Sequence, residues 1–192
     1  MSADAAQRLM GEAVRCDGLA QQALLRGDAA RSRTLFRAAA ERYRASWEGA
    51  GPDAFGRLIG LLKSSILSGE GGQAAAYVRE ALGDRCDTPA SAYALALAAL
   101  AQGDDEAALP AVEGMRAGGE AFAQTADALH ALAVGDRNAY AKAVTAIVAD
   151  FAARQEHLTG VAFADTAVML ERLAAPRGVA VRPASAVMPV LG

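Results

Sequence analysis

Apolar and small residues recur every three to four positions along most of the chain, and glycine- or proline-containing breaks separate the periodic segments. This period is typical of amphipathic helices. The pattern predicts nine helices, over residues 4–26, 28–48, 52–68, 72–83, 89–102, 104–117, 119–134, 136–155 and 161–175. We therefore predict an all-α fold with about nine helices.

The breaks between the periodic segments carry residues that start and end helices. Asp28 and Asp136 each follow a glycine, and each side chain is placed to accept hydrogen bonds from the free N–H groups of the next helix. Thr88 precedes Pro89, which suits a first helical position, and residues 52–53 are expected to begin the third helix. Four glycines suit the position after a helix end, where a positive φ is needed: Gly27, Gly69, Gly103 and Gly135.

Composition supports close helix packing. The chain of 192 residues holds 50 alanines, whereas aromatic residues make up 5%. Alanine is the best helix former, and its small side chain lets helices approach closely. Residues 1–177 are expected to form a single helical domain. The segment 178–192 contains Pro183 and Pro189 among several valines, so it is expected to lie extended against that domain.

Four segments share one spacing frame, with intervals of 42, 34 and 32 residues between their glycines. Small or apolar residues stand 7 positions before and 5, 9 and 12 positions after each glycine, and the last three share a helix face. In chain order the four sets are Ala20, Ser32, Phe36 and Ala39; Leu62, Ala74, Val78 and Ala81; Ala96, Ala108, Val112 and Met115; Ala128, Tyr140, Val144 and Ile147.

The frame resembles the tetratricopeptide repeat over about residues 10–155. The unit at Gly27 fits best, whereas valine replaces the family's aromatic residue in the other three units. The resemblance implies an α-α superhelix of antiparallel helix pairs, whose concave face binds peptides or protein segments. The first helix of each pair, over 4–26, 52–68, 89–102 and 119–134, would line that face. An irregular helical bundle with Gly-acid turns is the alternative.

Charge and cysteine content exclude several classes. The net charge of −3 gives no support for nucleic-acid binding, which usually requires a basic surface. The longest apolar stretch, 92–101, is too short to span a bilayer, and the N-terminus shows no signal-peptide pattern. We expect a bacterial cytoplasmic protein without membrane contact, in which Cys16 and Cys86 are reduced core residues.

Neither catalysis nor a cofactor is indicated. The chain has two histidines and two cysteines, and it lacks a phosphate-binding loop and a nucleophile elbow. His157 lies in a predicted loop, with Asp150 and Asp165 near it in sequence, but no metal-ligand spacing is present. We expect no enzyme activity, no cofactor and no metal.

Arginines provide the candidate partner-binding residues. Four of them are spaced 7, 4 and 7 positions apart, next to aromatic side chains, and guanidinium groups bind carboxylates in a bidentate manner. A solvated helix face beside a buried one is the alternative interpretation. The candidate residues are Arg26, Arg33, Arg37, Arg44, Tyr43 and Trp47.

The C-terminal segment 163–178, followed by Ser185 and Pro189, resembles some all-α immunity proteins of bacterial toxin systems. That resemblance implies neutralisation of a cognate toxin. The leading prediction is thus a non-enzymatic protein-interaction module with a protein partner. The alternatives are a self-associating structural homodimer and a binder of a small anionic ligand that uses the arginines.

Overall fold

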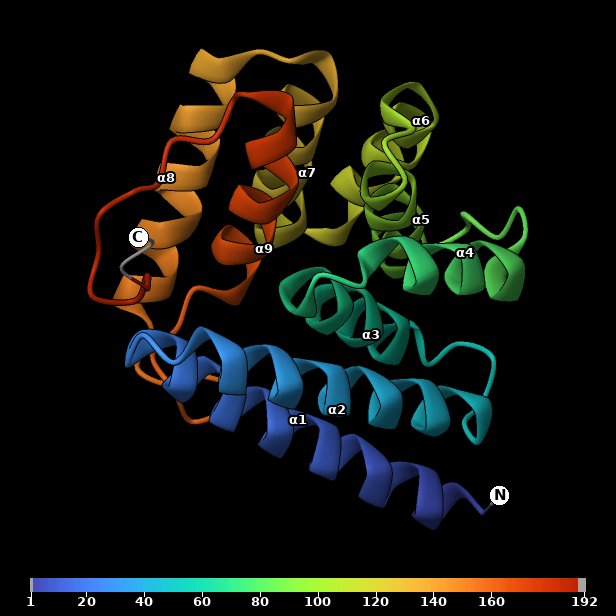
Figure 1. Ribbon diagram of the computed structural model, residues 1–192. Coiled ribbons are helices and arrows are strands. Elements are labelled where there is room, and N and C mark those ends of the chain that lie inside the picture. The colour runs from blue at the N-terminus through green and yellow to red at the C-terminus, as the bar shows by residue number, and fades with distance from the viewer. Residues whose placement is uncertain (1, 190–192) are drawn as a thin grey trace.

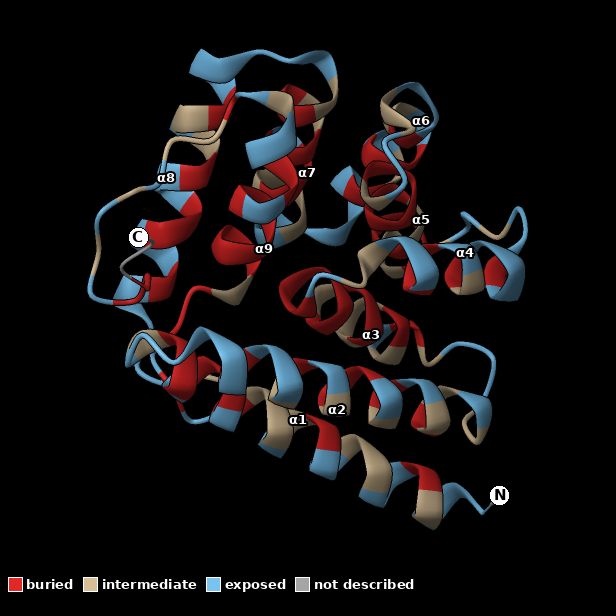
Figure 2. Ribbon diagram, viewed as in Figure 1, coloured by how far each residue is buried: buried red, intermediate tan, exposed pale blue. Residues whose placement is uncertain are grey.

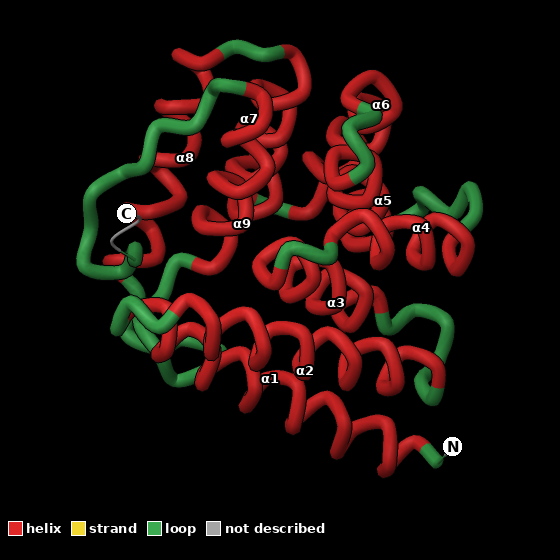
Figure 3. The backbone as a smooth tube through the Cα atoms, in the orientation of Figure 1, coloured by secondary structure: helices red, strands yellow, loops and turns green. Residues whose placement is uncertain are grey.

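The computed structural model describes residues 2–189, and within this range the chain forms nine α-helices and no strand (Figure 1, Figure 3). The all-α prediction with about nine helices is confirmed. The helices are α1 (Ala3–Leu25), α2 (Ala29–Glu48), α3 (Phe55–Ser68), α4 (Gly71–Leu82), α5 (Pro89–Ala101), α6 (Asp105–Met115), α7 (Glu120–Val134), α8 (Arg137–Ala153) and α9 (Asp165–Ala174). Two short 3-10 helices follow α6 and α9, over Arg116–Gly118 and Ala175–Arg177.

The predicted helix starts and ends are largely those of the structure. The Asp28 side chain accepts a hydrogen bond from the Arg31 N–H at 3.0 Å, and Asp136 accepts from the N–H groups of Asn138 and Ala139. Thr88 forms a capping box at the start of α5. The four glycines predicted to need a positive φ have φ values between +72° and +93°.

Two predicted starts were wrong. Helix α3 begins at Phe55 instead of residue 52, and Asp53 pairs with Arg85 at 2.8 Å instead of capping the helix. Helix α9 begins at Asp165 instead of residue 161. Val161 and Phe163, which precede it, lie in an irregular segment and are buried. Their apolar pattern therefore reflects burial and not a helix.

Each helix packs against the next one along the chain, and α3 and α7 both also contact α5 (Figure 1). Helix α9 departs from this order, because it contacts α3 and α7 as well as α8. In Figure 1 it lies on the inner side of the chain's curved path, between α8 and α3. The C-terminal helix therefore fills space that a simple succession of helix pairs would leave open.

The spacing frame marks buried positions. All sixteen residues of the frame are buried except Ala81, which is exposed near the end of α4. The buried residues of α4 are Ala74, Ala75, Val78 and Leu82, so the last turn of this helix buries position 82 instead of 81. The regular superhelical arrangement of the pairs stays a prediction.

The core is centred on α5, which is buried nearly all round (Figure 2). Ala92, Ala94, Ala96 and Ala98 are each 0% exposed. Such small residues leave room for neighbouring helices on every side, and this explains why an alanine-rich helix stands at the centre.

Arg177 holds the end of α9 against the turn between α5 and α6. Its guanidinium donates to both carboxylate oxygens of Asp105, and to the backbone oxygens of Leu173 and Leu100 at 2.7 Å each. Its side chain is 15% exposed. Bidentate pairs of this kind are among the stronger hydrogen-bonding arrangements in proteins.

Glu171 holds the segment after α9. Its buried carboxylate accepts hydrogen bonds from the Tyr140 hydroxyl at 2.8 Å, from the Arg182 N–H at 2.7 Å and from the Val181 N–H at 3.1 Å. Arg182 has a positive φ of 48°, a backbone conformation that is uncommon for residues other than glycine.

The segment from Gly178 to Pro189 contains no helix, and Val179, Val187 and Met188 within it are buried. The Ala164 N–H donates to the Val187 oxygen at 2.8 Å, so this segment also covers the entry to α9. Residues 190–192 of the predicted tail lie outside the described residues.

Candidate functional site

A pocket of about 320 Å³ lies on the inner side of the fold, where α1, α3, α5, α7 and α8 meet the segment before α9. Its walls combine aromatic and aliphatic side chains with several charged ones. Volumes of this size hold small organic ligands. Residues of α1, α2, α3, α5, α7, α8 and α9 all contribute to its lining.

Asp17 of α1 is the first polar group of the pocket. The Tyr43 hydroxyl donates to its Oδ2 at 2.8 Å, and the Ser64 hydroxyl donates to its Oδ1 at 2.8 Å. Tyr43 reaches this position because Gly60 of α3 has no side chain: a Cβ there would lie 2.7 Å from the Tyr43 ring. Three helices thus fix the orientation of one carboxylate.

Burial raises the pKa of Asp17 from its ordinary value of 3.8 to about 6. Hydrogen bonds from Ser64 and Tyr43 lower this pKa, the charge of Asp165 raises it further, and the charge of Lys63 lowers it. Burial also raises the pKa of Tyr43, followed by the negative charge of Asp17. Tyr43 therefore stays a phenol that donates its proton to the carboxylate.

Asp17→Asn is expected to stabilise the protein at pH 7.5, on the order of 2 kcal/mol, because one pKa unit corresponds to about 1.4 kcal/mol. With Asp17 present, the unfolded chain loses its proton near pH 4 but the folded chain holds it until about pH 6. Stability of the natural protein therefore falls as pH rises through this interval. Urea unfolding of both proteins between pH 4 and 7.5 measures the difference, which should vanish near pH 4. A pH-independent difference would contradict the assignment.

Lys63 of α3 is the second polar group of the pocket. Its ammonium group forms an ion pair with Asp165 at the start of α9 and donates to the Thr166 hydroxyl at 3.0 Å. The Lys63 and Asp165 side chains are 16% and 29% exposed. Burial lowers the pKa of Lys63, but the charge of Asp165, its hydrogen bond to Lys63 and the charges of Tyr93 and Asp17 together outweigh this, so the pKa is raised. Lys63 is a protonated cation at neutral pH and not a free amine nucleophile.

Tyr93 of α5 is the third polar group. Its side chain packs edge-on against Phe122 with ring centroids 6.0 Å apart, and burial raises the pKa of its hydroxyl. Among the described residues this hydroxyl is the buried side-chain oxygen that has no hydrogen-bond partner. Buried polar groups without partners are rare and costly, so the hydroxyl needs an explanation.

The predicted partner-binding residues do not form one surface. Arg26 ends α1 and is separated from α2 by the Gly27 turn, so its spacing to Arg33 does not place both on one helix face. Arg33 is exposed, and it has no ion-pair partner among residues 2–189. Arg37 pairs with Glu70 at 2.6 Å.

The other predicted residues make contacts within the protein. Arg44 pairs with Glu48 at 3.0 Å and lies over the Tyr77 ring. Tyr43 is buried at the pocket, which corrects its place on a partner-facing surface. Trp47 is half-buried and stacks on Phe55 with a centroid distance of 6.2 Å.

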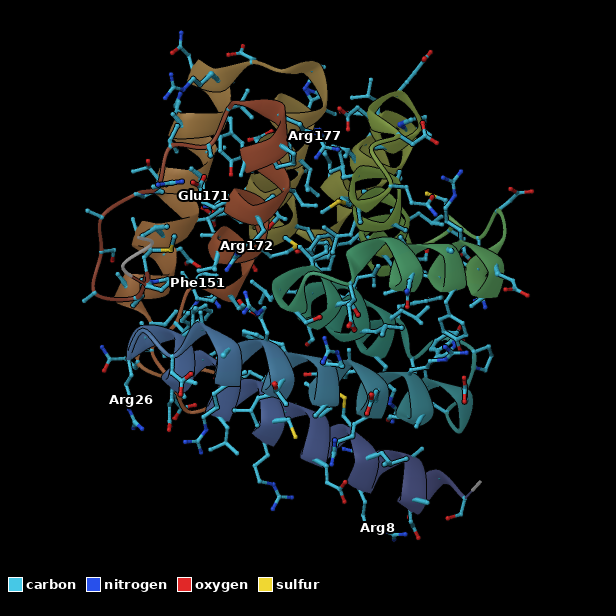
Figure 4. All side chains as sticks on the ribbon, in the orientation of Figure 1. Arg8, Arg26, Phe151, Glu171, Arg172 and Arg177 are labelled. Carbon is cyan, nitrogen blue, oxygen red and sulfur yellow. The ribbon has the colours of Figure 1, made fainter. Side chains whose placement is uncertain are left out.

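The exposed side of α1 was not predicted as a candidate binding surface from the sequence. Arg8, Arg15, Leu19 and Arg26 are spaced 7, 4 and 7 positions apart and are all exposed, with Leu19 at 47%. We call these four residues the α1 outer face. Arg8 and Arg26 project away from the other helices (Figure 4). None of its arginines has an ion-pair partner within residues 2–189. The spacing of 7, 4 and 7 positions that indicated Arg26, Arg33, Arg37 and Arg44 also relates these four residues.

The residues considered for a metal are used elsewhere. Asp150 pairs with Arg154 and Asp165 pairs with Lys63, while the ring of His157 stacks against Phe151. Across the described part of the chain, no three His, Cys, Asp or Glu residues are placed to share a metal ion. Cys86 is exposed, which corrects its prediction as a core residue, and Cys16 is half-buried.

None of the helices within residues 2–189 combines the length and the apolar character needed to cross a membrane. Comparison with protein-family models, with curated proteins and with solved structures finds no match to this chain.

Proposed function

We propose that this protein is a non-enzymatic protein-interaction module of the bacterial cytoplasm, built as a helical-repeat scaffold, which binds an acidic protein surface through the α1 outer face. The single observation that carries the proposal is the row of three exposed arginines around Leu19. Arginine is enriched at protein interfaces, where an exposed apolar side chain among charges provides the buried centre.

The charge distribution supports an acidic partner. The first 50 residues hold eight arginines against six acidic residues, whereas the remaining 142 hold 11 basic and 16 acidic residues. The excess of positive charge thus lies in the segment that contains α1 and α2. Long-range attraction of this kind speeds association with a partner of opposite charge.

The position of α9 supports an outer binding surface. A helical-repeat protein commonly binds its partner in the concave face, but here α9 lies against α3, α7 and α8. Arg177 and Glu171 fasten it there. A peptide entering that face would have to displace both contacts, whereas the α1 outer face requires no rearrangement.

Neutralisation of a cognate bacterial toxin is one specific form of this proposal, and it requires a toxin with an acidic surface. The homodimer alternative is disfavoured at this surface, because a two-fold contact would bring the arginines of both copies together. The anion-binder alternative has one supporting observation: Arg33 and Arg172 line a second pocket, of about 710 Å³, beside the start of α4.

Charge reversal tests the proposal. The full chain is immobilised in three forms: natural, Arg8→Glu/Arg15→Glu, and the matched control Arg137→Glu/Lys142→Glu on the exposed side of α8. A protein from the source bacterium that binds the natural chain is expected to bind the α1 variant at least tenfold more weakly at 150 mM salt. The control is expected to bind normally. Tenfold corresponds to about 1.4 kcal/mol.

Affinity for the natural chain should also fall as the salt concentration rises, because the charges involved are exposed. Exposed substitutions of this kind change stability little, so both variants remain folded by circular dichroism. Equal affinity of the α1 variant and the natural chain for every partner would refute the proposal.

A further inference from the structure

The pocket carries an excess of negative charge. Its lining includes Asp17, Asp150 and Asp165, against Lys63 and Arg154 as permanent cations. Lys63 is paired with Asp165, and Arg154 with Asp150. Asp17 is therefore the carboxylate left without a cation, and neutral hydroxyl groups alone donate to it. A buried carboxylate is stabilised by a paired cation.

The second observation is the Tyr93 hydroxyl. Tyr93 lines the same pocket, is 8% exposed, and has no hydrogen-bond partner for its hydroxyl within the described range. The charges of Lys63 and Asp165 and the nearby Thr166 side chain all act on this hydroxyl, so it lies near the polar end of the pocket, although no group there meets it with hydrogen-bond geometry. An N–H donor from a bound molecule would satisfy the hydroxyl oxygen, and an acceptor would satisfy its proton.

The third observation is the aromatic wall. Phe122 and Phe151 line the pocket with Ile59 and Ile147. The guanidinium carbon of Arg154 already lies 3.8 Å from the centroid of the Phe151 ring, at the edge of the pocket. Aromatic faces attract cations, and the attraction grows where water is excluded. An aromatic wall beside an unpaired carboxylate is a suitable environment for an ammonium group.

We propose that this pocket binds a small organic amine, whose ammonium group pairs with Asp17 and hydrogen-bonds to the Tyr93 hydroxyl while its apolar body lies against Phe122 and Ile147. The pocket volume of about 320 Å³ fits a molecule of this class. An anionic ligand is disfavoured, because Lys63, the less exposed of the two permanent cations that line the pocket, is already paired with Asp165. This site is separate from the α1 outer face and does not depend on the proposed function.

Binding of three probes of similar shape tests the ligand class. The probes are 2-phenylethylamine, the neutral 2-phenylethanol and the anionic 3-phenylpropionate, each titrated into the full chain at pH 7.5 and followed by calorimetry and by protein NMR shifts. The amine is expected to bind at least tenfold more tightly than the alcohol, with the anion weakest. Equal or tighter binding of the alcohol or the anion would overturn the proposal, and so would absence of amine binding at millimolar concentration.

Two variants locate the site. Asp17→Asn keeps the shape of the side chain and removes its charge, and it is expected to weaken amine binding at least tenfold. Tyr93→Phe removes the unpartnered hydroxyl and is expected to weaken binding threefold to tenfold with little loss of stability, because no hydrogen bond of normal geometry within the described chain is broken. Asp84→Asn, at an exposed position outside the pocket, is the matched control. Amine affinity that is the same in Asp17→Asn and Asp84→Asn would contradict the assigned site.

Discussion

Replacing Glu171 by alanine is expected to lower the free energy of unfolding by about 3–5 kcal/mol, because a buried hydrogen-bonding centre is removed and its partners stay behind. The Tyr140 hydroxyl and the N–H groups of Val181 and Arg182 would all lose their acceptor. Tyr140 is 0% exposed, so water does not replace the carboxylate at that position. The effect should be the largest of any single polar substitution considered for this protein.

Urea unfolding measures the loss, and hydrogen exchange of the Val181 and Arg182 amides reports whether the segment after α9 is released. Glu171→Gln is the matched control: its amide oxygen still accepts from the two N–H groups, and its NH2 group donates to the Tyr140 oxygen. The control is expected to lose about 1–2 kcal/mol. If alanine and glutamine destabilise the protein equally, with the amides still protected, Glu171 is not the anchor of this segment.

Replacing Lys63 by methionine is expected to cost about 2–4 kcal/mol, because it leaves the carboxylate of Asp165 unpaired and removes the positive charge that lowers the pKa of Asp17. The cost comes from the unpaired charges and not from lost packing, since methionine has a similar length. Adding Asp165→Asn should therefore restore most of the stability. Asparagine keeps the oxygen that accepts from the Thr166 N–H, at 2.7 Å in the natural protein.

A double-mutant cycle of Lys63→Met and Asp165→Asn by urea unfolding measures this coupling. The double variant is expected within about 1 kcal/mol of the natural protein, as found when buried ion pairs are replaced by neutral groups. Lys142→Met, at an exposed lysine of α8, should change stability by less than about 0.5 kcal/mol. Additive losses in the double variant would mean that the two side chains do not act as a pair.

Helix ends and buried faces could be predicted from local residues. Asp28 and Asp136 cap the helices they precede, and positions such as Phe36, Val112 and Tyr140 are buried as the spacing frame predicted. Both features depend on the 3.6-residue period and on backbone groups within one turn. Interactions between residues so close in sequence can be recognised from a short segment of the chain.

The pocket could not be predicted, because its polar groups come from distant segments. Asp17, Lys63 and Asp165 lie on α1, α3 and α9, and nothing in their local sequence indicates which helix faces which. Asp105 illustrates the same limit. An acid at a helix start is explained by the helix dipole alone, yet this one binds Arg177, 72 positions away.

Tyr43 shows what a helical period contains and what it does not. Its spacing to Phe36 and Ala40 places it on the apolar face of α2, and that face is buried. The Tyr43 ring can reach Asp17 because Gly60 on α3 provides the space. This glycine is seventeen positions away on another helix, so the period of α2 indicates burial but not the contact.

The position of α9 in the chain determines when its contacts form during synthesis. Lys63 and Thr166 are 103 positions apart, so their contact forms only after α9 has left the ribosome. Helices α1 to α8 emerge first and build their neighbouring contacts from local pairs, which close quickly. Until α9 follows, the apolar surface that it covers on α3 and α7 remains open to water, to chaperones and to other nascent chains. Helix α9, which is translated after α1 to α8, thus covers an apolar surface that the partly synthesised chain leaves exposed.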